Sequence, residues 1–163
     1  MEQLTFKELN SEEKPLKVCA FTGHREMPLE DVKDLKKLIV FLIEQGVDKF
    51  LCGMAIGFDL YAANCVLKLK KRYPHIKITA CAPYYGQEKN FPEKDKILYA
   101  RTLKKCDEII YVSEQYTKGC MHKRNQFMAD NADCLIAYIR KDTGGTAYTV
   151  KYFSKKNKPI FKV

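Results

Sequence analysis

The sequence contains no long hydrophobic run, and this absence excludes one class of protein at the outset. No apolar stretch among its 163 residues approaches the ~20 residues that a membrane-spanning helix needs. Residues 1–15 are too polar for a secretory signal peptide. We therefore expect a cytoplasmic protein with no membrane partner.

Cysteine is present, but not in the patterns that hold metals or build disulfide frameworks. The seven cysteines are an odd number and form neither a CxxC pair nor a Cys/His ligand spacing. A reduced thiol inside an apolar strand behaves as a small hydrophobic side chain. We expect this of the four cysteines within or at the ends of apolar segments, Cys19, Cys52, Cys81 and Cys134, and we expect no metal site.

Acidic residues are too few to balance the basic ones. Twenty Asp and Glu stand against 29 Lys and Arg, which gives a formal net charge of +9. A basic excess favours anionic partners, which include nucleotides, nucleic acids and acidic proteins. Because the cations are spread over the polar sides and C-terminal ends of predicted helices, a solvated surface explains most of them, and the indication of a nucleic-acid partner is weak.

The chain also lacks internal repeats and low-complexity segments, and its length suits one domain. Residues 1–15 are polar without a sustained period, so we predict a flexible lead-in there and a single domain over residues 16–163. Within that domain, short apolar segments alternate with helical patterns. The predicted strands are residues 17–21, 49–52, 76–82, 107–112, 134–139 and 159–163.

This alternation predicts an α/β fold with three layers. We expect a Rossmann-like, mostly parallel sheet of about six strands with helices on both faces. The first helix is predicted to run without a break from Pro28 to about Gln45. In such sheets, ligands bind outside the carboxyl ends of the strands, where the strand order reverses.

The turn after the fifth predicted strand is the strongest candidate for a binding site. It contains Gly144, Gly145 and Thr146 and opens a helix. Two glycines at this place let the backbone come close to a ligand, and the free N–H groups of the helix start suit an anion. We favour a bound phosphate over a plain helix start.

Cationic side chains open the preceding helix at residues 121–124, where the helix dipole disfavours them. They are tolerable on a solvated surface and useful where an anion is expected. We favour phosphate binding by Arg124, with an ion pair to a carboxylate such as Asp130 as the alternative. Together with the glycine turn, this segment is interpreted as half of a phosphate-binding cleft.

The first predicted strand is followed by Gly23, His24 and Arg25. Gly23 either lets the backbone approach a phosphate or only makes a tight turn. His24 takes either a structural hydrogen bond or a chemical role. For Arg25 we favour an anion clamp over a surface arginine, because guanidinium matches phosphate with two parallel hydrogen bonds.

The loops after the second and third strands complete the candidate site. Gly53 and Gly57 allow a close loop that enters a helix, and Asp59 lies in the first turn of that helix. Its carboxylate suits capping of backbone N–H groups, with a hydrogen bond to a ribose hydroxyl as the alternative, although GxGxxG is absent. Tyr84 either stacks on a base or covers the edge of the sheet.

These motifs resemble two known families. Residues 52–62, CGMAIGFDLYA, resemble the SGxAxGID loop of the DNA-processing DprA proteins, and residues 121–124 with 144–146 resemble the MHxRK and PGGxGTxxE motifs of the LOG proteins. Both families belong to the SLOG superfamily of Rossmann-like nucleotide-binding proteins, and the chain from residue 17 onward is most similar to the YpsA-like branch. The resemblance implies a pocket for a nucleotide or a derivative such as ADP-ribose or NAD, and makes a homodimer plausible.

The resemblance also bears on catalysis. LOG proteins remove the base from nucleoside monophosphates with an arginine, matched here by Arg124, and a glutamate, in whose place Tyr148 stands. A carboxylate is needed to stabilise an oxocarbenium-like centre or activate water. We therefore favour a nucleotide-binding or sensing protein and assign no catalytic residue. The alternatives are an N-glycosidic hydrolase that uses Asp59 or Glu88, and a single-stranded DNA-binding protein of DprA type.

Overall fold

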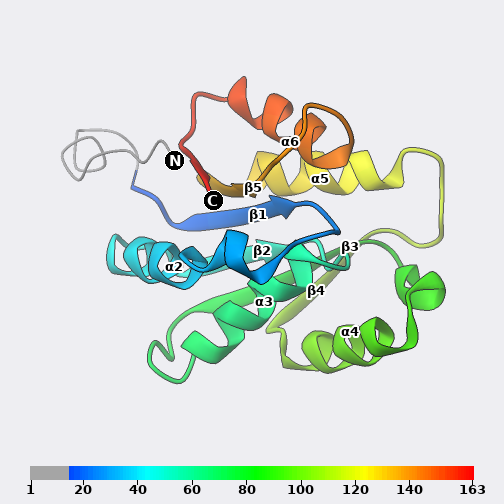
Figure 1. The fold of residues 1–163 in the computed structure, drawn as a ribbon, viewed down its shortest axis with the longest axis horizontal. Coiled ribbons are helices and arrows are strands. Elements are labelled where there is room, and N and C mark those ends of the chain that lie inside the picture. The colour runs from blue at the N-terminus through cyan, green and yellow to red at the C-terminus, as the bar shows by residue number, and fades with distance from the viewer. Residues whose placement is uncertain (1–14) are drawn as a thin grey trace.

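The computed structural model describes residues 15–163 and contains a six-stranded sheet in which every strand pair is parallel. The strand order is β4-β3-β2-β1-β5-β6 (Figure 1). In chain order the strands are β1 (Val18–Gly23), β2 (Lys49–Cys52), β3 (Lys77–Tyr84), β4 (Glu108–Ser113), β5 (Cys134–Tyr138) and β6 (Ile160–Lys162). The predicted lead-in, residues 1–15, lies outside the described residues except for Pro15.

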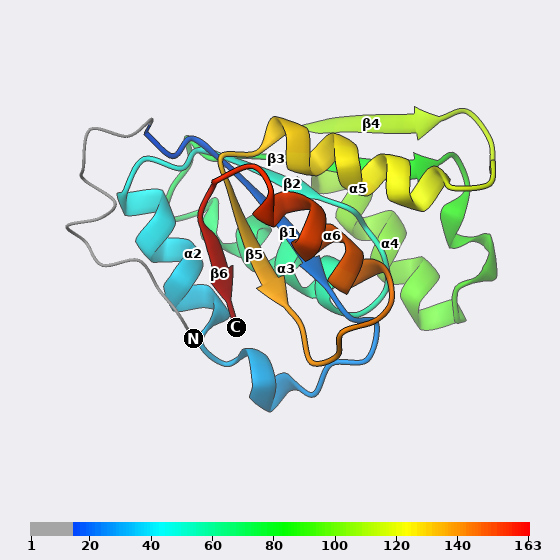
Figure 2. The same ribbon diagram turned by 90° about the horizontal axis from the view of Figure 1, so that it is seen from above.

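Helices cover both faces of this sheet. On one face lie α2 (Leu35–Glu44), α3 (Phe58–Leu69) and α4 (Glu93–Lys105), and on the other lie α5 (Cys120–Asn131) and α6 (Gly145–Ser154) (Figures 1 and 2). Two short 3-10 helices, η1 (Leu29–Val32) and η2 (Gln87–Asn90), follow β1 and β3. The predicted three-layer α/β fold is confirmed, and the sheet is wholly parallel.

Alternating strand residues build two cores. On the side of α2 and α3, Phe21 and Phe50 stack with ring centroids 5.8 Å apart. On the opposite side, small strand residues such as Ala20 pack under Met128 of α5 and Phe153 of α6. Full burial of a large apolar side chain contributes about 1.5–3 kcal/mol, so both layers hold the sheet. The four cysteines predicted to lie in the core, Cys19, Cys52, Cys81 and Cys134, are buried.

The helix predicted from Pro28 to Gln45 is broken, and that prediction was wrong in its first turns. The chain forms the short η1 and then restarts as α2, with Leu29 66% exposed. A contact from outside the helix explains the break. The Tyr138 hydroxyl donates a 2.8 Å hydrogen bond to Asp31, which ties η1 to the end of β5.

β4 lies at one edge of the sheet, as β6 does at the other, and its side chains are more exposed than those of the central strands. It pairs only with β3, and Ile109 and Tyr111 are 41% and 37% exposed. β5 is buried along its whole length, as its apolar sequence predicted. No helix among residues 15–163 is long and apolar enough to cross a membrane.

The strand order reverses at β1, which positions the site. From β1 the chain proceeds outward through β2, β3 and β4, and then crosses back to place β5 on the other side of β1. Loops after β1 and β5 therefore diverge to opposite faces and leave a hollow at the carboxyl ends of the strands.

Candidate functional site

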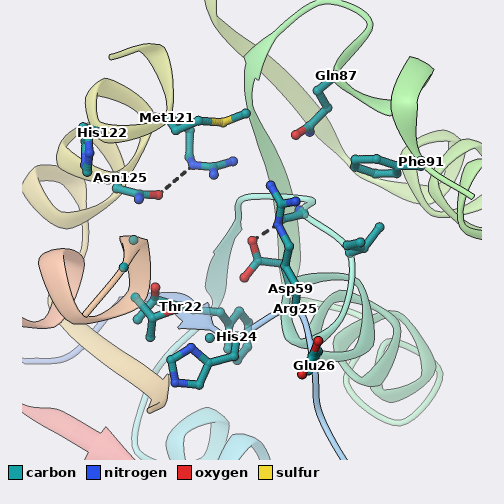
Figure 3. Close-up of a pocket in the computed structure, with 18 of the residues that line it drawn as sticks. Thr22, His24, Arg25, Glu26, Asp59, Gln87, Phe91, Met121, His122 and Asn125 are labelled. Carbon is teal, nitrogen blue, oxygen red and sulfur yellow. Dashed lines mark hydrogen bonds between the residues drawn. The ribbon is translucent and has the colours of Figure 1, made fainter. Parts of the chain in front are cut away.

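A pocket of about 780 Å³ opens at this reversal point (Figure 3). Its volume lies within the ~300–1,000 Å³ typical of small-molecule sites. Its walls come from the loops after β1, β2, β3 and β5 and from the starts of α5 and α6. The lining residues are Phe21, Thr22, Gly23, His24, Arg25, Glu26, Ala55, Ile56, Asp59, Tyr84, Gln87, Asn90, Phe91, Met121, His122, Arg124, Asn125, Lys141, Thr143, Gly144, Gly145 and Thr146.

The structure brings most of the predicted site residues together here. Those that line the pocket are Gly23, His24, Arg25, Asp59, Tyr84, Arg124, Gly144, Gly145 and Thr146. Gly53 and Gly57 lie outside the lining. The predicted convergence of strand ends on one hollow is therefore present, while ligand binding by these residues stays a prediction.

Arg124 is buried, with 5% of its surface exposed, and holds the loop after β2 in place. Its Nη1 donates to the carbonyls of Gly53 and Cys81, and its Nε donates to Asn125 Oδ1 at 2.8 Å. Burial lowers the pKa of Arg124, and the nearby Asp59 opposes that shift. The guanidinium thus bridges the ends of β2 and β3 from α5.

The alternative pairing of Arg124 with Asp130 was wrong. Asp130 instead accepts a 2.8 Å hydrogen bond from the Tyr152 hydroxyl and forms a 2.6 Å ion pair with Lys156. The reason is helical geometry. Residues six apart on a helix point to different sides, so Arg124 faces the sheet while Asp130 faces α6.

Arg124 retains unused donors. A guanidinium carries five N–H groups, and the three hydrogen bonds to Asn125, Gly53 and Cys81 use Nε and Nη1 only. Among residues 15–163, no group accepts a hydrogen bond from Nη2. Nη2 is not among the buried side-chain atoms that lack a partner, so this charged donor is accessible from the pocket that Arg124 lines, where an acceptor can reach it.

Asp59 is a second buried charge, with 7% of its surface exposed. Its Oδ2 accepts a 3.2 Å hydrogen bond from the Ala55 backbone, so it closes the loop before α3 and does not cap the helix itself. Burial raises the pKa of Asp59 to about 6, although Arg124 and Arg25 act to lower it. The carboxyl group therefore changes charge close to neutral pH.

Three of the predicted glycines are explained by packing inside the protein. A Cβ at Gly23 would lie 2.3 Å from the Phe58 ring, and one at Gly57 would lie 2.1 Å from the Arg25 carbonyl oxygen. A Cβ at Gly53 would lie 2.8 Å from Arg124 Nη1 and 2.9 Å from Asp59 Oδ2. Close approach of the chain to itself, and not to a phosphate, thus requires glycine at these positions.

The glycines at the start of α6 differ from those three. Gly144 has φ 92°, which favours glycine, while a Cβ at Gly145 would meet no described atom within 4 Å. Internal packing therefore leaves the backbone at Gly145 open to the pocket. Because Gly145 begins α6, its N–H and the two that follow have no partner within the helix.

His24 forms a structural hydrogen bond, which was one of the two roles that the sequence left open for it. Its Nε2 accepts a 2.8 Å bond from the Arg140 backbone, and its ring packs edge-on against Tyr138. Burial lowers the pKa of His24, and the positive charges of Lys141 and Arg140 lower it further. The ring is therefore neutral near pH 7, with its proton on Nδ1.

For Tyr84 the structure gives a position in the pocket wall, and stacking on a base stays a prediction. It lines the pocket and also packs edge-on against Tyr116, with ring centroids 5.5 Å apart. Its neighbour Tyr85 is 69% exposed and packs against Tyr111 of the edge strand.

Sequence reasoning missed several polar lining residues. Thr22 and Gln87 are 7% and 5% exposed, and Glu26, Asn90 and Lys141 also line the pocket. Thr22 had a usable signal, because it lies at the end of the first strand and directly precedes Gly23. Gln87 had little, because η2 is a four-residue element entered through Gly86 at φ 89°. Glu88, once a candidate carboxylate, is not among the lining residues.

Comparison with known sequences places this chain among YpsA-like proteins. The sequence profile of the YspA SLOG family (YpsA) matches residues 14–161. The uncharacterized SPbeta prophage-derived protein YoqJ of Bacillus subtilis is 32% identical over 138 residues, which cover 74% of this chain and 81% of YoqJ. The UPF0398 protein YpsA of the same organism is 28% identical over 155 residues and covers 86% of each chain.

Solved structures of DprA share the fold. DprA from Streptococcus pneumoniae matches with a TM-score of 0.68 at 20% identity, over 90% of this chain and 50% of that one. DprA from Helicobacter pylori, described for its single-stranded DNA binding mode, matches with a TM-score of 0.66 at 20% identity, over 91% of this chain and 65% of that one. This chain thus spans only part of either DprA, and the likeness concerns the fold. The profile match over nearly the whole length makes the chain a member of the SLOG superfamily, in its YpsA-like branch.

Proposed function

We propose that the pocket binds a nucleotide or a nucleotide derivative of the ADP-ribose or NAD class, and that the protein is a binding or sensing module. The observation that carries this proposal is the pair of unused Nη2 donors on the buried Arg124. A guanidinium in such a wall needs an acceptor, and phosphate oxygens match it well.

The start of α6 supports a phosphate at this end of the pocket. The backbone beside Gly145 is open, and the helix dipole places partial positive charge at its free N–H groups. Thr146 adds an independent observation, because this polar residue is buried, with 7% of its surface exposed. None of the described residues forms a hydrogen bond with its hydroxyl, so that group remains available to a ligand.

The balance of charge in the lining also favours an anion with polar hydroxyl groups. The cationic side chains are Arg25, Arg124 and Lys141, against the carboxyl groups of Glu26 and Asp59. The cations and the α6 dipole suit phosphates, while carboxyl groups are the usual partners of ribose hydroxyls. A ligand with both features is a nucleotide.

Isothermal titration against AMP, NAD and ADP-ribose tests the proposal. We expect at least one of them to bind with a Kd below 1 mM, a threshold of about 4 kcal/mol. Arg124→Ala should abolish binding, while Arg101→Ala on the exposed side of α4 should leave it unchanged. Absence of binding by all three ligands to the folded wild-type protein would refute the proposal.

A second candidate is the hydrolysis of an N-glycosidic bond. It is favoured by Asp59, a pocket carboxyl group whose raised pKa of about 6 suits proton transfer near neutral pH. Incubation with nucleoside monophosphates and NAD, followed by chromatography for the free base, tests it. Turnover that is lost in Asp59→Asn would support this candidate, and no release of base across the panel would remove it.

A further inference from the structure

We propose that Gln87 and Phe91 form the base-binding end of the pocket and that Gln87 selects a base with an exocyclic amino group, as in adenine. This inference rests on the proposed nucleotide function and adds the class of base. It assigns the pocket a direction, with phosphates at the start of α6 and the base at η2.

The two ends of the pocket differ in chemistry. The α6 end offers cations and backbone donors, which suit phosphates and give nothing to a neutral aromatic ring. The η2 end offers the Phe91 ring and an uncharged amide, and both lie on the side away from His24 and Thr22 (Figure 3). Aromatic side chains are the usual platforms for bases.

The orientation of the Gln87 amide follows from its neighbours. Its Nε2 lies 3.5 Å from the Gly53 carbonyl oxygen and 3.5 Å from the Tyr99 hydroxyl. A carbonyl can only accept, so the amide nitrogen must face Gly53 and the oxygen must face away. Figure 3 shows that Oε1 points into the pocket.

This oxygen has no donor of its own. Gln87 is 5% exposed, and none of the described residues donates a hydrogen bond to Oε1. Because Glu88 Oε2 is the one buried side-chain N or O atom without a partner among the described residues, Oε1 of Gln87 is accessible from the pocket. A bound ring would cover this acceptor, so the site favours a ligand that brings an N–H group to it. The amino group of adenine is such a donor, while a ring without that group leaves Oε1 unsatisfied.

Phe91 provides the surface beside this acceptor. Its ring is half-buried and is held from behind by an edge-on contact with Tyr99, at 5.9 Å between centroids and 89° between planes. The contact restrains the ring at the pocket wall. A restrained ring loses little freedom when a base packs against it.

The test compares AMP with purine riboside 5′-monophosphate, which differs only by lacking the amino group. For wild type we expect AMP to bind roughly five- to a hundredfold more tightly, because the analogue would cover Oε1 and leave it without a donor. In Gln87→Leu this ratio should fall to about one. If Gln87 only supported the Gly53 loop, the variant would weaken both ligands equally and keep the ratio, and the inference would be wrong.

Phe91→Ala gives a second measurement with its own internal reference. We expect it to weaken AMP by roughly tenfold and to leave ribose 5-phosphate, which has no base, unchanged. Equal losses for both ligands would contradict a base at this end. Failure of every ligand to bind wild type would refute the nucleotide proposal itself, whereas equal binding of AMP and its deamino analogue would refute only the selection of the base.

Discussion

Asp59 and Arg124 lie on either side of Gly53, so close that no side chain fits between them. A Cβ at Gly53 would lie 2.9 Å from Asp59 Oδ2 and 2.8 Å from Arg124 Nη1. Two side chains of opposite charge thereby pack against the same buried backbone position, one from α3 and one from α5. The glycine is required by this contact and not by an unusual backbone angle, because Gly53 has no positive φ.

Gly53→Ala should therefore destabilise the protein by about 1–3 kcal/mol, the typical cost of overpacking a well-packed site. Urea denaturation measures it. Gly145→Ala is the matched control, because its new methyl group meets no described atom within 4 Å and we expect stability equal to wild type or slightly higher. A Gly53→Ala protein as stable as wild type would contradict the role given to this contact.

The same Gly145→Ala variant should lose ligand affinity while it keeps the fold. The methyl group would occupy the open space beside the start of α6, where a phosphate is proposed to lie. We expect a loss of roughly tenfold or more for AMP or ADP-ribose, equivalent to about 1.4 kcal/mol. Unchanged affinity would show that the phosphate lies elsewhere.

Asp59 predicts a pH dependence of stability with a definite sign. Because its folded-state pKa is raised to about 6, the folded protein binds a proton that the unfolded chain releases near pH 4. Stability from this group is therefore present at low pH and falls as pH rises from about 4 to about 6. We expect the unfolding free energy of wild type relative to Asp59→Asn to fall by roughly 3 kcal/mol across that window.

Urea denaturation of both proteins at intervals between pH 4 and pH 7 measures this difference. The comparison cancels the titration of groups that the two proteins share. A flat difference across the window, or one that rises with pH, would contradict the assignment of the raised pKa to Asp59.

Single-stranded DNA binding also remains a prediction for this chain. If DNA binds through the cations of the pocket, its affinity must weaken as salt increases, because each neutralised phosphate releases counterions. Gel-shift titrations with a labelled oligonucleotide at two salt concentrations measure this. Lys141→Ala should reduce the salt dependence by about one unit of slope, and absent or salt-insensitive binding excludes this function.

The predicted homodimer can be examined at the exposed edge strand. Ile109 and Tyr111 are the large apolar side chains that β4 leaves open, and an unpaired strand edge is a ready template for another chain. Sedimentation analysis should show association at high concentration that Ile109→Lys abolishes. A wild-type protein that stays monomeric at all concentrations would contradict the prediction.

The sequence predicted best what depends on neighbours along the chain. The apolar run of β5 predicted a buried strand, and the glycines before α6 predicted a helix start. Both predictions rest on patterns of neighbouring residues. The hydrogen bond from Arg124 to the Gly53 carbonyl could not be predicted from the sequence, because the two residues lie 71 positions apart. For Gly23 the sequence left a phosphate contact and a tight turn both open, because the nearby Phe58 ring lies 35 residues later in the chain.

The sequence also did not predict that β4 is exposed, because this exposure depends on long-range strand pairing. Its sequence, EIIYVS, is as apolar as that of a central strand, and only the strand order places it at the edge. Gln87 escaped notice because a short 3-10 helix has no periodicity that separates a buried polar residue from an exposed one.

The central position of β1 has a consequence for the newly synthesised protein. β1 leaves the ribosome well before its neighbour β5, which begins more than a hundred residues later at Cys134. The pocket takes residues from both of these regions, so its ligand cannot be recognised until α6 has emerged. A nucleotide added during translation would thus act only after α6 has been synthesised, when it would join two segments that lie far apart in the sequence.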